Sequence, residues 1–184
     1  MNSGSSNSSH TILSPDCPHH NQKAAEAVQL IGERLGREQA TLAVAESCTG
    51  GLVSHWLTNV AGSSDYFLFS AVTYSNDAKI SMLGVSPETL DKFGSVHIET
   101  AKEMARGVRS ISKATYGLST TGIAGPGGGS REKPVGTVCV GLAAPDAVKG
   151  VQYHFSCSGR VKNKEAFAAA ALELLKNHLL SSCP

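Results

Sequence analysis

Short apolar runs alternate along this chain with segments whose apolar residues recur at helical spacing. The runs rich in β-branched and aromatic residues are TLAVA at 41–45, YFLFSAVTY at 66–74 and TYGLSTTG at 115–122. Helical periodicity marks the stretches between them, most clearly at Ala101, Met104 and Val108. Strands that alternate with amphipathic helices are typical of a sheet covered by helices, so the pattern predicts an α/β fold.

The last apolar runs have a different connection. VGTVCVGLA and GVQYHFS are separated only by a short turn-forming segment with Pro145 and Gly150, which predicts an antiparallel hairpin. The sheet should therefore be mixed. Helical periodicity at 22–35 and at 163–180 supplies further covering helices. Together these elements predict a three-layer α/β/α sandwich with a mixed sheet.

Length and composition favour one domain. The 184 residues with 41% hydrophobic content suffice for a single core. Residues 1–20 are rich in Ser, Asn, His and Pro, and we expect them to form a disordered tail before a domain at 21–184. The pair His19 and His20 has no further ligand nearby in the sequence, so a polar tail is preferred to a metal site.

Charge and cysteine usage restrict the partners. Sixteen basic and fifteen acidic residues leave a net charge of +1, which argues against nucleic-acid binding. No apolar run approaches the roughly 20 residues that cross a bilayer, so no membrane association is expected. Five scattered cysteines lack zinc-site spacing and indicate reduced thiols in a cytoplasmic protein. A homo-oligomer is expected.

Three segments of small and polar residues follow predicted strands, where open α/β sheets place ligands. In AESCTGG, Ser47 and Thr49 lie where a strand passes into a helix, and amide N–H groups there can face an anion. The alternative for this segment is an ordinary capped helix start. In VTYSNDAK, Lys79 lies near a helix N-terminus, where the helix dipole disfavours a cation. Such a misfit suggests a functional role, and a solvated surface lysine is the alternative.

The third segment is the glycine-rich TTGIAGPGGGS at 120–130. Its glycines allow close backbone approach to a phosphate, but it has neither the GxGxxG nor the GxxxxGK[ST] spacing, and a flexible connection is the alternative. Arg160 follows the last predicted strand and is a candidate phosphate ligand.

Read together, these segments resemble the CinA C-terminal-domain family. The motifs AESCTGG, GSS, VTYSN with AK, LGV, TGIAGPGGG and EKPVGTV match its pattern in order over roughly Ala25 to Leu179. The resemblance implies an α/β/α domain that converts nicotinamide mononucleotide to nicotinate mononucleotide and ammonia, in pyridine-nucleotide salvage. This chain departs from the family at FSCSGR, where relatives read FxGDR, which weakens the assignment of Arg160. His97 replaces a common serine at a helix start, where it affects capping.

The resemblance also implies roles for individual residues. Ser47 is the expected nucleophile, Lys79 its base and Tyr74 a further catalytic group. A buried or charge-neighboured lysine can act as a base because its pKa falls below about 10.4. No metal and no cofactor are required. The expected substrate-binding residues are Thr49, Gly50, Asn76, Thr121, Gly122, Gly125 and Arg160.

Two other functions remain open at this point. One is a non-catalytic nucleotide-binding or regulatory module of the same fold, because a matching site does not guarantee turnover. The other is catalysis by Cys48, which is less favoured because adjacent residues at a helix start point in different directions.

Overall fold

The structure is a computed structural model that describes residues 11–14 and 20–181. A six-stranded sheet with the order β1-β6-β5-β4-β2-β3 forms its middle layer. The strands are β1 (Thr11–Ser14), β2 (Leu42–Glu46), β3 (Phe67–Val72), β4 (Tyr116–Gly122), β5 (Thr137–Ala143) and β6 (Val148–Phe155). The helices are α1 (His20–Glu38), α2 (Leu52–Thr58), α3 (Asn76–Leu83), α4 (Pro87–Phe93), α5 (Ile98–Ser112) and α6 (Arg160–Ser181), with a 3-10 turn at Ser63–Asp65.

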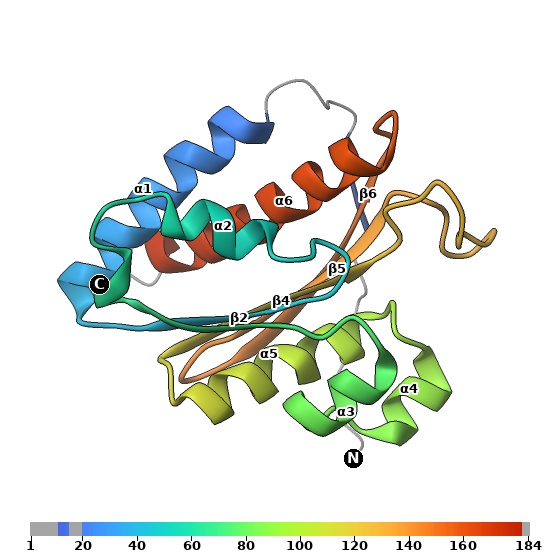
Figure 1. Cartoon of the computed structure of the whole chain (residues 1–184), viewed down its shortest axis with the longest axis horizontal. Helices are drawn as coiled ribbons and strands as arrows, with labels where there is room; N and C mark the ends of the chain where they lie inside the picture. The colour runs from blue at the N-terminus through green and yellow to red at the C-terminus, as the bar shows by residue number, and fades with distance from the viewer. Residues whose placement is uncertain (1–10, 15–19, 182–184) are drawn as a thin grey trace, which may run out of the picture.

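Helices cover both faces of the sheet. Helices α1, α2 and α6 pack together on one face, and α3, α4 and α5 pack on the other (Figure 1). The larger core lies under α1 and α6, where Leu42 and Val44 of β2 meet Phe167. A smaller core under α5 joins Ala43 of β2 to Met104. The predicted three-layer α/β/α sandwich is confirmed.

Strand directions explain where a ligand can lie. Strand β2 pairs in parallel with both β3 and β4, so the three carboxyl ends meet at one edge of the sheet. Strands β4, β5 and β6 pair antiparallel, which confirms the mixed sheet and the predicted hairpin. Glycine allows α5 to approach this sheet closely, since a Cβ at Gly141 would lie 2.2 Å from the Ala101 carbonyl oxygen.

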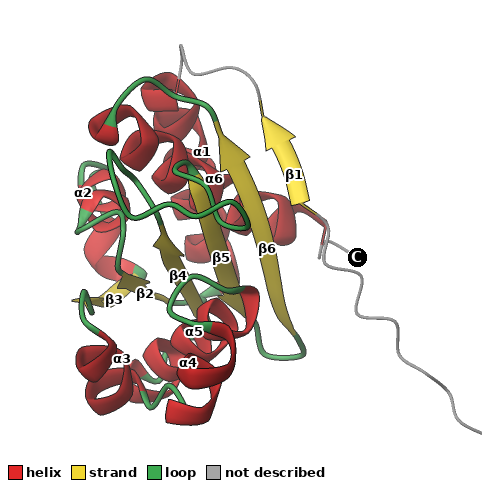
Figure 2. Ribbon diagram, turned by 90° about the vertical axis from the view of Figure 1, so that its right-hand side faces the viewer, coloured by secondary structure: helices red, strands yellow, loops and turns green. Residues whose placement is uncertain are grey.

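Two expectations need correction. Thr11–Ser14 lies in the segment expected to be disordered, but it forms β1 and pairs in parallel with β6 at the edge of the sheet (Figure 2). The edge strand β6 supplies backbone hydrogen-bonding partners for these residues, and the composition of a segment does not reveal such partners. The rest of the predicted tail, including His19, lies outside the described residues, and α1 begins at His20.

The second correction concerns the cysteines. Cys157 is disulfide-bonded, so the expectation of reduced thiols is wrong for this residue. Whether two cysteines can pair depends on their separation in space, which wide spacing in the sequence does not show. Cys48 and Cys139 are buried free thiols, as expected. None of the helices in the described part of the chain is long and apolar enough to cross a membrane.

Candidate active site

Ser47 lies in the turn between β2 and α2. Its amide N–H donates to the carbonyl oxygen of Thr120 on the neighbouring strand β4, at 3.0 Å. Gly50 and Gly51 then reverse the chain with φ values of +61° and +96°, which side chains with a Cβ rarely adopt. The turn therefore holds Ser47 at the carboxyl edge of the sheet, with only 8% of its surface exposed.

Glu46 organises this turn, a role that was not predicted from the sequence. Its carboxylate accepts five hydrogen bonds, from the hydroxyl of Thr49, the amides of Gly51 and Val53, and both the amide and the hydroxyl of Ser54. These bonds satisfy amide groups at the start of α2, and the negative charge complements the positive end of the helix dipole. A glutamate directly before a strand-to-helix turn was the available signal.

This capping decides which amides can act on a substrate. The N–H groups of Gly51, Val53 and Ser54 are committed to Glu46, and that of Gly50 donates to the Ser47 carbonyl. No hydrogen bond among the described residues uses the amides of Cys48 or Thr49. Those two N–H groups are therefore the free donors in the turn.

Lys79 reaches Ser47 from the first half of α3. Ser75 caps that helix by accepting from the amide of Ala78. The lysine side chain is 1% exposed, and its Nζ lies 3.2 Å from Ser47 Oγ and 3.1 Å from the carbonyl oxygen of Thr73. The alternative of a solvated surface lysine is excluded by this burial.

The surroundings of Lys79 disfavour the charged form of its amine. Burial lowers the pKa of its amine, because the charged form loses its hydration. Within the described residues no carboxylate forms an ion pair with Lys79. Lys79 is therefore suited to act as a base, because its charged form is disfavoured and its amine lies next to the Ser47 hydroxyl.

Cys48 and metal ligands are the other groups that could carry chemistry. Burial, reinforced by the charge of Glu46, raises the pKa of the Cys48 thiol to about 12. A thiol with that pKa supplies almost no thiolate at neutral pH, which makes it a poor nucleophile. In the described part of the chain, no three His, Cys, Asp or Glu side chains lie where they could share a metal ion.

Arg160 links two of the predicted segments. Its Nη1 donates to the carbonyl oxygen of Gly125 at 2.7 Å, and its Nη2 donates to the hydroxyl of Tyr74 at 2.6 Å. Tyr74 is otherwise open to solvent, with 59% of its surface exposed. The first residue of α6 therefore connects the glycine loop to the segment between β3 and α3.

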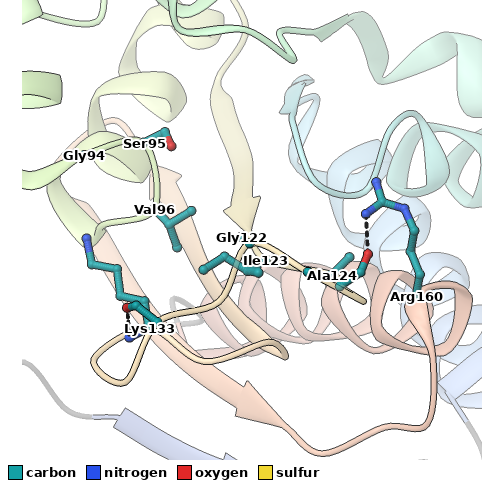
Figure 3. Close-up of a pocket in the computed structure, with 12 residues that line it drawn as sticks. Gly94, Ser95, Val96, Gly122, Ile123, Ala124, Lys133 and Arg160 are labelled. Carbon is teal, nitrogen blue, oxygen red and sulfur yellow. Dashed lines mark hydrogen bonds between the residues drawn. The ribbon is translucent and has the colours of Figure 1, made fainter.

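A pocket of about 440 Å³ lies beside the glycine loop (Figure 3). Gly122, Gly125 and Arg160, all predicted binding residues, line it. The pocket's other wall comes from the loop between α4 and α5, and the side chain of Lys133 also lines the pocket. Neither was predicted from the sequence. Lys133 belongs to the EKPVGTV motif, and its place in a motif that resembles the family was the available signal.

The remaining predicted binding residues have mixed positions. Thr49 is buried, and its hydroxyl bonds to Glu46 and to Thr120, so it supports the turn. Thr121 donates to the carbonyl oxygen of Ser95 and anchors the pocket wall. Asn76 is exposed at the first position of α3, and Gly50 is exposed next to Lys164. The substrate-binding roles of all the predicted binding residues, Asn76 and Gly50 among them, stay predictions.

Comparison with known proteins identifies relatives of this chain. The family model described as the CinA C-terminal domain matches residues 24–179. The CinA-like protein of Desulfosudis oleivorans is 58% identical over 150 residues, covering 82% of this chain and 36% of that protein. The CinA-like protein of Desulforapulum autotrophicum is 55% identical over 152 residues, covering 83% and 36%. The chain thus spans about a third of these relatives' length.

Solved structures agree with the fold. The competence/damage inducible protein CihA from Agrobacterium tumefaciens is 42% identical and superimposes with a TM-score of 0.82. The alignment covers 86% of this chain and 96% of that one. The competence-damaged protein superfamily protein from Enterobacter cloacae is 33% identical, with a TM-score of 0.81, and covers 85% and 92%.

Proposed function

Because the chain belongs to the CinA C-terminal-domain family, we propose that it hydrolyses the carboxamide of nicotinamide mononucleotide to nicotinate mononucleotide and ammonia. The observation that supports this most directly is the 3.2 Å separation between Ser47 Oγ and Lys79 Nζ. A hydroxyl beside a buried amine is a nucleophile paired with a base. The enzyme would act in the cytoplasm, in pyridine-nucleotide salvage.

The first half of the reaction forms an acyl-enzyme. Neutral Lys79 takes the proton of the Ser47 hydroxyl as Oγ attacks the carboxamide carbon. The free amides of Cys48 and Thr49 donate to the oxygen that becomes negative. Collapse of the tetrahedral intermediate breaks the C–N bond, and the lysine ammonium returns its proton to the departing nitrogen.

The second half regenerates the enzyme. Water attacks the acyl carbon while neutral Lys79 accepts a proton from it, and Ser47 leaves with a proton from the ammonium. Tyr74 can assist the proton transfers, and Arg160 holds its hydroxyl in place. The glycine loop and Arg160 would hold the nucleotide beside this pair.

Purified protein incubated with nicotinamide mononucleotide tests this proposal. Ammonia and nicotinate mononucleotide should appear without added metal, and Ser47→Ala should abolish their formation. Cys48→Ser is the matched control at the adjacent position, and it should retain most activity because the Cys48 thiol is protonated.

The result also separates the alternatives. If Ser47→Ala remains active while folded Cys48→Ser is dead, the cysteine is the nucleophile. If wild type is stabilised by the nucleotide but releases no ammonia from neutral to alkaline pH, the protein is a binding module and the proposal is wrong.

A further inference from the structure

The pocket beside the glycine loop is separate from the nucleophile. Its walls are Gly94–Val96, Gly122–Gly125 and the loop from Gly127 to Lys133, closed at one end by Arg160, and neither Ser47 nor Lys79 lines it. Figure 3 shows Lys133 and Arg160 on opposite sides of the glycine loop. A ligand that reaches both Ser47 and this pocket must therefore be bipartite.

The distance between the two places is short. Ser47 follows Glu46, which pairs with Thr120 in the parallel ladder between β2 and β4. Ser47 is therefore opposite Thr121, and Gly122 on the pocket wall is one residue further along, so it lies about 6 Å from the Ser47 backbone. One nucleotide can therefore place its amide at Ser47 and its other end in the pocket.

The charged side chains that line the pocket are all positive. Lys133 and Arg160 are the charged residues that line it, and no carboxylate does so. The guanidinium of Arg160 already donates to Gly125 and Tyr74. The Nζ of Lys133 donates one hydrogen bond to the carbonyl oxygen of Phe93, at 2.7 Å. Two of its three N–H donors therefore remain for a ligand.

Backbone donors add to this charge. No hydrogen bond among the described residues uses the amide N–H of Gly125, Gly127 or Gly128. Gly125 and Gly128 have φ values of +85° and +84°, and successive amides in such loops can form a concave anion site. These free amides and the ammonium of Lys133 are hydrogen-bond donors, and the oxygens of a phosphate are acceptors that such donors bind.

We propose that this pocket is a phosphomonoester subsite in which Lys133 supplies the charge that binds the phosphate, while Arg160 positions the loop. This inference rests on the proposed function for the identity of the whole substrate. The pocket takes the 5′-phosphate of the nucleotide, and Ser47 takes its carboxamide. Selectivity for a nucleotide over the phosphate-free nucleoside then depends on Lys133.

Kinetics with two substrates test Lys133. In Lys133→Met, KM for nicotinamide mononucleotide should rise about tenfold or more, because a charge-assisted hydrogen bond is lost. The KM for nicotinamide riboside, which has no phosphate, should stay within about twofold. Lys133→Arg should restore part of the nucleotide affinity. A lysine that only tethers the loop to Phe93 would affect both substrates alike, and that result would overturn the proposal.

Lys92→Met is the matched control. Lys92 is an exposed lysine that lies over the Phe93 ring and does not line the pocket. Its loss removes the same charge nearby, and KM for the nucleotide should remain near the wild-type value. An equal rise in KM in both variants would indicate long-range electrostatics and contradict a local phosphate contact.

A binding measurement separates this inference from the proposed function. Ribose 5-phosphate has no amide, yet it should raise the melting temperature of wild type and not that of Lys133→Met. If this holds while wild type releases no ammonia, the subsite stands and the amidohydrolase proposal fails. If ammonia is released but neither the melting shift nor the KM depends on Lys133, the subsite is wrong and the enzyme assignment stands.

Discussion

The Nζ of Lys79 lies 3.2 Å from the Oγ of Ser47, although the two residues are 32 positions apart in the sequence. They approach because parallel strands β2 and β3 end at the same edge of the sheet. Lys79 also donates to the carbonyl oxygen of Thr73, which fixes the amine from a second side. A nucleophile and its base are thus positioned by two separate strand-to-helix turns.

Substituting Lys79 tests whether it must lose its proton. Arginine keeps the positive charge but does not deprotonate in proteins, so Lys79→Arg should lower kcat by about 10²–10⁴-fold, nearly as much as Lys79→Met. In wild type, kcat/KM should fall as pH drops through the pKa of the amine. Burial lowers that pKa, so this limb should lie below the ordinary lysine value of 10.5. Near-normal kcat in the arginine variant would leave Lys79 as an electrostatic anchor only.

Glu46 should be essential for stability. In Glu46→Gln, the amide group has the size of the carboxylate but presents N–H donors to a turn that supplies donors. We expect a loss of about 3 kcal/mol in the free energy of unfolding, measured with urea, since buried hydrogen bonds to a charged group are lost. Glu26→Gln on the exposed face of α1 is the control and should change stability little. Equal stability of both variants would exclude the capping role of Glu46.

His97 should make stability depend on pH. Its Nδ1 accepts from the amide of Glu99 at the start of α5 and must be unprotonated to do so. Burial first and the charge of Lys133 second lower its pKa below 6.5, whereas the charge of Glu99 raises it and that of Lys102 lowers it. The unfolded chain therefore binds a proton at a higher pH than the folded one. The stability that His97 contributes is present above about pH 6.5 and declines as pH falls.

Two variants of His97 separate capping from titration. His97→Ser keeps a helix cap without a titratable group, so stability should match wild type near pH 8 and fall less on acidification. His97→Ala should cost about 1 kcal/mol even at pH 8, because the cap is lost. Urea unfolding from pH 5 to pH 8 measures both. A wild-type pH slope in His97→Ser would show that this histidine does not titrate on unfolding.

The glycine loop should not tolerate a side chain at Gly125. A Cβ there would lie 2.6 Å from Val135 Cγ1, and φ is +85°. Gly125→Ala should therefore lower stability by about 1–2 kcal/mol and raise KM for the nucleotide. At Gly127, which also lines the pocket, an added Cβ meets no heavy atom within 4 Å. Gly127→Ala is the matched control, and equal effects at the two positions would contradict this steric account.

The sequence by itself predicted the layered α/β architecture and the residues that form the candidate pair. Periodicity and caps such as Ser75 and Gly84 report local free energies, which act over a few residues and can be read along the chain. Only the tertiary structure decided that Glu46 caps α2, that Lys133 faces the glycine loop, and that β1 joins β6. The capping by Glu46 is local and depends on the turn that follows β2, whereas the bond from Lys133 to the Phe93 carbonyl oxygen and the pairing of β1 with β6 join segments distant in the chain. The energy of such contacts arises only once the sheet has brought the segments together, so no local pattern records it.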